Sequence, residues 1–539
     1  MANTFKKVLD QLVWRQVTPS PNAHSAAQSL ASDLRSDLSR NPFVYQTVSN
    51  TVMNRYNIVT KSWQPMASMA LAGTFGAGAA SAFVPSLGLV GTIAAGATTT
   101  SVVLSTALPT AVGLNMLANR GGSGEYGFKL RIIDTVAGKT AERYIEANTA
   151  GTTPTIRVAS SFGFTPSSGA RYEIVAGRLF SLGAGTTAAN IWRSFEVASN
   201  TLSSGLSTTN LPATIGTDSD IMVLDEQYTP YNCSPGDGMV KGAYNYDSGV
   251  VQRYALTATA AGASSLTGQA TLGDAVVAAN EYRNFQIRIV EDTVNTTAVG
   301  QRRIIASHTA GPSPVYTLGT AWSVTPSSSA KFVIELPNLM LVRSTGNTTV
   351  YTYNYGDATV NNGTNSIAAN AWSTTYFGVA PAANGAGGVW MPSWGIQPDA
   401  ARNARHSFCY FHRGGGAFSL DVLDIAGGTT GLWTGAVVFD GNTTALNVGS
   451  CGSYSPFENE GRMFYINAYV ASANNQFFRF DVQNRVLSPY TNTDFIQAGT
   501  AALGKRVAAY AALDGTDTYD VVMMQSHLST IAQELVVLV

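Results

Sequence analysis

The sequence predicts a mainly β protein that carries two inserted copies of a small antiparallel β module and a short helical segment at its N-terminus. Short runs of Val, Ile, Tyr, Phe and Thr alternate with clusters of Gly, Asn, Asp and Ser along most of the 539 residues, a pattern typical of strands and turns. A second observation is that one stretch of sequence occurs twice in the same order. Third, apolar residues at helical spacing are convincing only within residues 1–50.

The N-terminal segment, residues 1–50, is expected to hold two short helices. Residues 25–38 (SAAQSLASDLRSDL) form one candidate, and Pro19 and Pro21 separate it from the other. The other is marked by four apolar residues at helical spacing, which are Val8, Leu9, Leu12 and Val13. No apolar run follows the lysines near the start, so we do not expect a secretory signal.

An uncharged run follows, because no Asp, Glu, Lys or Arg occurs from Ser62 to Asn119. A membrane span of about 20 apolar residues is one interpretation. The run is mostly Ala, Gly, Thr and Ser, however, and three prolines interrupt it: Pro65, Pro85 and Pro109. We therefore favour buried strands or a subunit interface over a membrane segment.

The internal duplication predicts two β modules, at residues 94–175 and 260–336, each with about four strands. In each copy Thr-Pro, at 165–166 and at 325–326, is expected to set a turn. In the first copy, Lys129 and Arg131 alternate with apolar residues, which predicts a half-buried strand. The matched segments are Ala94–Thr99 with Ala260–Ser265, Phe128–Val136 with Phe285–Val294, Arg143–Gly151 with Arg303–Gly311, and Phe162–Ile174 with Trp322–Ile334.

The rest of the chain, residues 51–93, 176–259 and 337–539, shows a fainter repeat of paired strands. Asn54–Pro65 aligns without gaps to Phe478–Pro489. Degenerate versions occur at Ile191–Phe195, Val350–Asn354 and Phe418–Val422. The pattern resembles the blades of Kelch-type propellers, in which a glycine-rich strand precedes an aromatic strand, and Gly414–Gly416 precede one candidate. The resemblance implies a Kelch-like β-propeller, and the tail Glu534–Val539 is expected to pair with an N-terminal strand and close the ring.

Composition excludes several functional classes. Charged residues make up 12% of the chain and the net charge is −1, which argues against both disorder and nucleic-acid binding, including sequence-specific binding. Near-zero charge opposes association weakly, so it indicates an assembly subunit. Three cysteines (Cys233, Cys409 and Cys451) do not make a disulfide framework and suit a reducing cytoplasm.

We expect no catalytic, cofactor-binding or metal-binding residues and no cofactor. His406, Cys409 and His412 form the main cluster of ligand-type side chains, but on a strand the two histidines share one face and the cysteine lies on the other. The glycine-rich stretches, at Gly76, Gly78 and Gly121–Gly124, are expected to be turns or tight packing. Cys233 lies in a Pro-Gly turn with no histidine nearby in sequence.

A glycosidase is the enzyme alternative that the sequence allows. Such an enzyme needs two carboxylates about 5 to 10 Å apart across a sugar-binding cleft. An acidic cluster is present, and tryptophans and tyrosines that could stack on sugars are plentiful. Acidic residues beside turns are more often solvated loop residues, and we expect this of the cluster Asp218, Asp220, Asp225 and Glu226.

The repeated module resembles one that is common in bacteriophage virion proteins. That pattern runs Ala-Gly-Ala-Thr-Thr, a Val-Arg-Ile-like strand, Gly-x-x-Arg-x-Ile, Asn-Thr-Ala, an aromatic residue and Pro-x-x-Ser-x-Tyr-x-Ile. The first copy fills it with Phe128–Ile132, Arg143–Ile145, Asn148–Ala150, Pro166 and Tyr172–Ile174, and the second with Phe285–Ile289, Gly300–Ile305, Trp322, Pro326 and Phe332–Ile334. The copies depart from the pattern at Gly138, five residues before Arg143, and at Ser307–Thr309.

The resemblance implies a structural subunit of the virion tail or the head–tail junction, of the sheath, nozzle or collar kind, made in the host cytoplasm. Its implied partners are copies of itself in a ring around the genome conduit and other tail, adaptor or portal proteins. One alternative is a receptor-binding fibre or capsid decoration protein that contacts a host-surface receptor. A less favoured alternative is a polysaccharide depolymerase.

Overall fold

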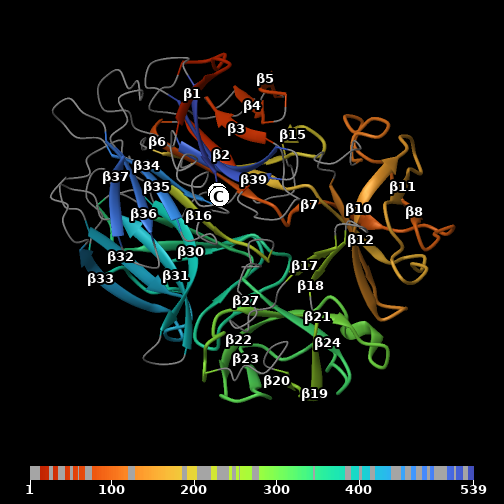
Figure 1. Ribbon diagram of the computed structural model, residues 1–539. Helices are drawn as coiled ribbons and strands as arrows, with labels where there is room; N and C mark the ends of the chain where they lie inside the picture. Colours follow the sequence, from red (N-terminus) through yellow and green to blue (C-terminus); the bar gives the residue numbers. More distant parts are fainter. Residues whose placement is uncertain are drawn as a thin grey trace, which may run out of the picture.

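The computed structural model (Figure 1) consists of β-strands and turns, with no α-helix among the residues that it describes. These residues are 13–23, 28–33, 43–48, 52–58, 60–66, 76–118, 128–184, 191–202, 220–226, 242–245, 250–253, 255–269, 278–343, 346–382, 390–399, 404–412, 419–438, 451–455, 463–468, 476–481, 486–490, 507–514, 517–525 and 532–538. The prediction of a mainly β protein is therefore confirmed for this part of the chain.

Six four-stranded antiparallel sheets form the framework of the described chain. Sheet 1 contains β2 (Ser29–Ser32), β3 (Phe43–Thr47), β4 (Met53–Asn57) and β5 (Ser62–Pro65). Sheet 2 contains β6 (Gly76–Val84), β13 (Arg178–Ala184), β14 (Ile191–Glu196) and β15 (Thr201–Leu202). Sheet 3 contains β16 (Asp220–Leu224), β25 (Leu339–Arg343), β26 (Val350–Asn354) and β29 (Ala371–Ser373).

The other three sheets belong to the C-terminal part of the chain. Sheet 4 contains β30 (Trp390–Asp399), β31 (Ala404–His412), β32 (Ser419–Asp424) and β33 (Leu432–Val438). Sheet 5 contains β34 (Cys451–Ser455), β35 (Met463–Ala468), β36 (Gln476–Asp481) and β37 (Val486–Tyr490). Sheet 6 contains β38 (Val507–Asp514), β39 (Asp517–Gln525), β40 (Ala532–Leu538) and the N-terminal strand β1 (Val13–Val17).

The six sheets form a closed, propeller-like ring. The first strand of each sheet contacts the first strand of the next, in the order β2, β6, β16, β30, β34, β38 and back to β2. Sheet 6 is completed by the N-terminal strand, because β1 pairs with β40 from Val13 opposite Val536 to Val17 opposite Ala532. The expected pairing of the C-terminal tail with an N-terminal strand is confirmed, and it leaves no open edge on β40.

The expected N-terminal helices are wrong wherever the structure describes the segment. Val13–Val17 and Ser29–Ser32 are strands, and all four residues of the latter are buried. Their partners β40 and β3 supply backbone hydrogen bonds and a packed surface that outweigh local helical spacing. The other residues of the two predicted helices, 8–12, 25–27 and 34–38, lie outside the described part.

The faint strand repeat corresponds to one position in the sheets. Tyr56 of β4 lies opposite Trp63 of β5, and the aligned Phe480 of β36 lies opposite Leu487 of β37, in the same register. The three degenerate segments fall on β14, β26 and β32. Together with β4 and β36, these are the third strands of sheets 1 to 5, so the aligned segments are equivalent strands of repeated sheets.

Each module contains six strands instead of about four, and each begins before its predicted bounds of residues 94–175 and 260–336. Module 1 contains β7 (Gly88–Thr92), β8 (Ser101–Val103), β9 (Lys129–Asp134), β10 (Lys139–Asn148), β11 (Thr155–Val158) and β12 (Arg171–Val175). Module 2 contains β19 (Leu256–Gly262), β20 (Ser265–Gly268), β21 (Gln286–Glu291), β22 (Arg302–His308), β23 (Val315–Leu318) and β24 (Lys331–Glu335), with the 3₁₀ turn η2 (Thr296–Ala298). Corresponding strands pair alike, as β7 with β12 and β19 with β24 show.

The uncharged run is strand-rich in its described part, as expected, but three of its four strands are only partly buried. It contains β5, β6, β7 and β8, and Ala79–Val84 of β6 are buried in sheet 2. Among the described residues there is no helix long and apolar enough to cross a membrane.

Both modules are insertions into the first hairpin of a sheet. The last residue of β6, Val84, lies opposite Arg178 of β13, and module 1 occupies the connection between them. Leu224 of β16 lies opposite Leu339 of β25 in the same way, with module 2 and the hairpin β17 (Gly242–Asn245) and β18 (Val250–Arg253) between them. Figure 1 shows the two modules outside the ring, module 1 in orange and module 2 in green. A further short pair, β27 (Val360–Asn361) and β28 (Ser366–Ile367), follows sheet 3 strand β26.

An aspartate fixes the same turn in each module. The Asp134 carboxylate accepts hydrogen bonds from the backbone N–H groups of Val136, Ala137 and Ser167, so it joins the β9 turn to the segment after Thr165-Pro166, where the turn lies at residues 168–169 rather than at Thr-Pro itself. Asp292 accepts equivalent bonds in module 2, including one from Ser327. Burial raises the pKa of each carboxyl, but these hydrogen bonds outweigh it and hold both pKa values below the usual range.

Candidate functional site: a charged cavity between the modules and sheet 3

A cavity of about 320 Å³ lies where module 1, module 2 and sheet 3 meet. This volume is at the lower end of the range of small-molecule sites, which is roughly 300 to 1,000 Å³. Leu87 and Val90 contribute apolar surface. The rest of the lining is rich in ionisable side chains, which are Arg131, Arg171, Arg178, Arg302, Glu173, Glu226 and Asp357.

Arg131 is at the centre of the charged groups. On β9, Leu130 and Ile132 point into the core of module 1, so the alternation of the strand turns Arg131 to the opposite face. Arg131 is 1% exposed and pairs with three carboxylates, at 2.5 Å from Glu226, 3.0 Å from Glu173 and 2.8 Å from Glu142. Burial lowers the pKa of Arg131, but the carboxylates, Glu226 foremost, outweigh it and raise that pKa well above its usual value.

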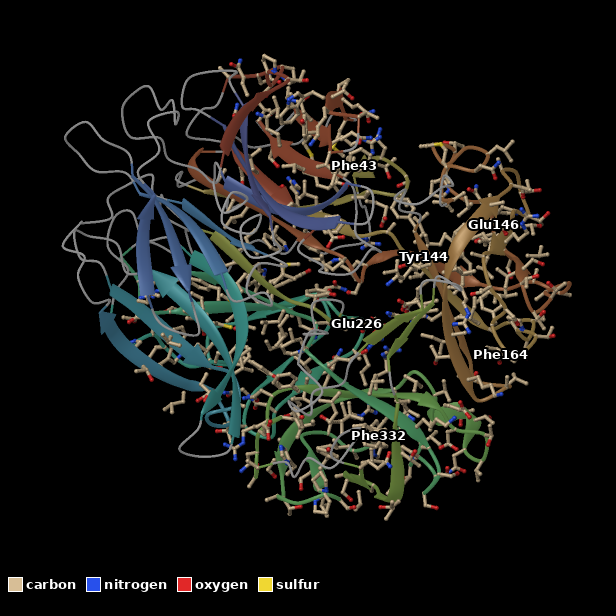
Figure 2. The ribbon with its side chains drawn as sticks, in the orientation of Figure 1. Phe43, Tyr144, Glu146, Phe164, Glu226 and Phe332 are labelled. Carbon is tan, nitrogen blue, oxygen red and sulfur yellow. The ribbon has the colours of Figure 1, made fainter. Side chains whose placement is uncertain are left out.

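Glu226 connects the two modules. It lies two residues beyond the end of β16, its side chain is 0% exposed, and Figure 2 shows it between the modules. One carboxylate oxygen lies 2.5 Å from Arg131 Nη1, and the other accepts a hydrogen bond from Nη2 of Arg302 on β22 at 3.0 Å. Burial lowers the pKa of Arg302, and Glu226 and its neighbours raise it more. One carboxylate of sheet 3 thus binds an arginine from each module.

Arg171 and Asp357 lie at the more exposed side of the cavity. Arg171 on β12 binds Glu173 at 2.9 Å and Asp357, beyond the end of β26, at 2.8 Å. Burial raises the pKa of the Asp357 carboxyl, but Arg302 and Arg171 lower it below its usual range. The ion pairs therefore continue from sheet 3 across module 1.

A buried hydroxyl pair lies behind the charged groups. Asp225 accepts hydrogen bonds of 2.6 Å from both Ser86 and Tyr355. Asp225 and Tyr355 are almost completely buried, and burial together with the nearby Asp225 charge raises the pKa of Tyr355 well above its usual value. These contacts join the start of module 1 to the strands of sheet 3.

The expectation of a solvated acidic loop is wrong for Asp225 and Glu226, since both are fully buried and hydrogen-bonded. The reason is that this loop leads from the ring into module 2 and is covered by module 1. Asp218 and the side chain of Asp220 lie outside the described residues. The described carboxylates of the cavity are each paired with arginine.

The other candidate residues stay apart from this cavity. His406, Cys409 and His412 lie on β31, where Cys409 alternates with the histidines and is 0% exposed. Burial raises the pKa of the Cys409 thiol, so it is a poor nucleophile. The side chains of the two histidines and of Cys451 are not described, and Cys233, the Gly121–Gly124 stretch and Gly414–Gly416 lie outside the described residues. Within the described part no group of three His, Cys, Asp or Glu residues is placed to hold a metal.

Sequence reasoning missed the role of Arg131 and Arg302. The half-buried strand expected around Arg131 is completely buried, because its polar face meets Glu226 instead of solvent. One signal was present: the duplication repeats Arg131 as Arg288, which pairs with Glu335 at 2.6 Å in module 2. An arginine kept between apolar residues in both copies indicates a buried ion pair.

Comparisons with known proteins give fold similarity at low scores. Neither a family model nor a curated protein matches the chain. Sqt1 of Saccharomyces cerevisiae has a TM-score of 0.26 and 9% identity over 98% of this chain and 99% of its own. A GH74 xyloglucanase of Xanthomonas campestris has a TM-score of 0.28 and 10% identity over 96% and 54%. The NanB sialidase of Streptococcus pneumoniae has a TM-score of 0.23 and 9% identity over 98% and 94%.

These distant matches are to β-propeller proteins, and none of the three is named as a virion protein. The propeller-like ring of this chain rests on its own strand pairings and contacts.

Proposed function

We propose that this chain is a non-enzymatic structural subunit of a bacteriophage virion, built on a Kelch-like β-propeller. In this proposal it is a tail or head–tail component of the sheath, nozzle or collar kind, and its copies form a ring around the genome conduit. The resemblance of the duplicated module to a phage virion module is the basis of the proposal. The near-neutral charge of the chain supports it, because little repulsion opposes association.

The placement of the two modules is the structural observation that supports the proposal most strongly. Both leave the ring at the first hairpin of consecutive sheets, so the ring of sheets closes without them. Strand β10 of module 1 pairs with β21 of module 2 through their backbones, with Lys139 opposite Glu291. Glu226 also binds an arginine of each module, so the two modules form one projecting unit. A projection outside a closed ring suits contacts between subunits.

Two equivalent valines mark a candidate contact surface on this projection. Val136 and Val294 follow the turn aspartates of modules 1 and 2, and they are 70% and 69% exposed. Large apolar side chains exposed at the same position of both copies are favourable contact points for a second subunit.

The test is the oligomeric state of the purified chain, measured by mass photometry and electron microscopy. We expect the wild type to form rings of about six or twelve copies. Val136→Asp with Val294→Asp should reduce ring formation at least tenfold, while the control Val379→Asp, at a 59% exposed site outside the modules, should not. Replacing residues 85–177 by an Asn-Gly turn should abolish rings. The circular dichroism signal of the β-sheets should remain, which shows that the ring of sheets is still folded.

Three other results would contradict the proposal in different ways. Normal rings from the variant without module 1 would show that this module is not needed for assembly. A stable trimer favours a receptor-binding fibre or decoration protein. Release of reducing sugar from host polysaccharide favours a depolymerase.

A further inference from the structure

The cavity described above has hydrogen-bond donors that are not used within the described structure. Its carboxylates already have arginine partners: Glu173 binds Arg131 and Arg171, Glu226 binds Arg131 and Arg302, and Asp357 binds Arg171. Their negative charge is therefore already matched, although each carboxylate can accept more than one hydrogen bond.

Two of the available donors are guanidinium groups. Arg178 donates a hydrogen bond from Nε to Glu196 and another from Nη2 to the Gly88 carbonyl. Its Nη1 makes no hydrogen bond within the described residues. Arg302 uses Nη2 for Glu226, and its Nη1 likewise has no hydrogen bond there. Both side chains line the cavity.

Two amides add further donors. The Asn338 side-chain oxygen accepts a hydrogen bond from Gln286, and the Asn370 side-chain oxygen accepts one from the Tyr353 hydroxyl at 3.5 Å. The NH₂ group of each has no hydrogen-bond partner in the described structure, and both residues line the cavity. Two guanidinium and two amide donors thus surround a space that also has an apolar side at Leu87 and Val90.

We propose that this cavity binds a small hydroxylated carboxylic acid of the size of one sugar ring, that is, a molecule of the uronic acid class. The carboxylate receives charge-assisted hydrogen bonds from the Nη1 groups of Arg178 and Arg302. Hydroxyl oxygens accept hydrogen bonds from the amides of Asn338 and Asn370. The C–H groups of the ring contact Leu87 and Val90.

The charge of the cavity favours a monoanion over a phosphate. Because each arginine of the lining already has a carboxylate partner, the charged groups nearly cancel before anything binds. A phosphate brings nearly two negative charges into this partly buried space, and their desolvation is costly without matching cations. A carboxylate brings one charge, so its desolvation costs less, and the unused Nη1 groups of Arg178 and Arg302 can donate hydrogen bonds to it. The proposal is independent of the virion role.

The test is calorimetric titration of the whole chain with sodium glucuronate, with glucose and inorganic phosphate as comparison probes. We expect glucuronate to bind at least tenfold more tightly than either probe, since charge-assisted hydrogen bonds to two arginines are lost with glucose. Binding of glucose or phosphate as tight as that of glucuronate overturns the proposal, and so does the absence of glucuronate binding at millimolar concentration.

Asn370→Asp is the variant of choice, because it keeps the shape of the side chain but replaces the NH₂ donor by a negative charge. Asn370 has a φ of 54°, a conformation that Asp also tolerates, so the backbone is not strained by the change. Asn200→Asp is the matched control, at a φ of 52° in the β14–β15 turn outside the cavity lining. We expect glucuronate affinity to fall at least tenfold in the former and to stay unchanged in the latter. Equal affinities in the two variants overturn the assignment.

Discussion

Replacing Glu226 by Gln tests whether the buried ion pairs hold the modules to the ring. Gln keeps the volume of Glu but removes the charge that lies 2.5 Å from Arg131 and 3.0 Å from Arg302. Arg131 keeps Glu142 and Glu173 as partners, whereas Arg302 loses its direct ion pair among the described residues. The change therefore leaves a buried cation without its closest counter-charge.

The magnitude follows from burial. Removing one partner of a buried ion pair costs about 3–5 kcal/mol, because the remaining charge stays desolvated. The Gln carbonyl can still accept one hydrogen bond, so we expect a loss near the lower limit, about 3 kcal/mol. Arg302→Gln should cost much less in the Glu226→Gln background than in the wild type, since the two changes remove the same interaction.

Urea unfolding, followed by tryptophan fluorescence, measures this loss. The control is Glu146→Gln, because Glu146 on module 1 pairs with Arg157 at the surface, where the two side chains are 49% and 59% exposed. Exposed pairs contribute about 0–1 kcal/mol, so this variant should unfold close to the wild type. Equal unfolding midpoints for Glu226→Gln and Glu146→Gln would refute the reasoning.

Two further predictions concern the paired modules. Leu130→Ala and Ile287→Ala remove equivalent, fully buried side chains, and each should destabilise the chain by about 2–5 kcal/mol in thermal or urea unfolding; a loss confined to one of them shows that the two cores are not equivalent. Asp292→Asn tests the lowered pKa of that carboxyl, whose stabilisation is complete above the unfolded pKa of about 3.9 and is lost as pH falls through the lower folded value. Wild type should therefore lose stability in that acid range more steeply than Asp292→Asn, and parallel pH profiles contradict the role of the carboxylate.

Sequence patterns predicted the repeated parts of this fold because repetition averages out local ambiguity. The aligned strands around Tyr56 and Phe480 proved to have one register, and both duplicated segments fold alike. Residues 29–32 had no such support, and their helical spacing misled because strand pairing with β3 decides their structure.

The candidate site could not be predicted from the sequence in the same way. Arg131, Glu226 and Arg302 are far apart in the chain, and the packing of both modules against the end of β16 brings them together. From local sequence alone, a charged residue next to a turn is predicted to be exposed to solvent. Whether it is buried depends on a partner that is distant in sequence. The repeated arginine at 131 and 288 was the one trace of this arrangement.

The pairing of β1 with β40 has a consequence for the order in which the sheets fold during synthesis. β1 is synthesised before every other strand that the structure describes, but its partner β40 is synthesised after all of them. Five sheets can form during translation while sheet 6 waits and β1 keeps an unpaired edge. Such long-range pairing is slow, and an unpaired strand edge invites association with other chains. Closure of the ring is therefore expected to wait until β1 pairs with β40. Nascent chains that stop before β40 should be the aggregation-prone species.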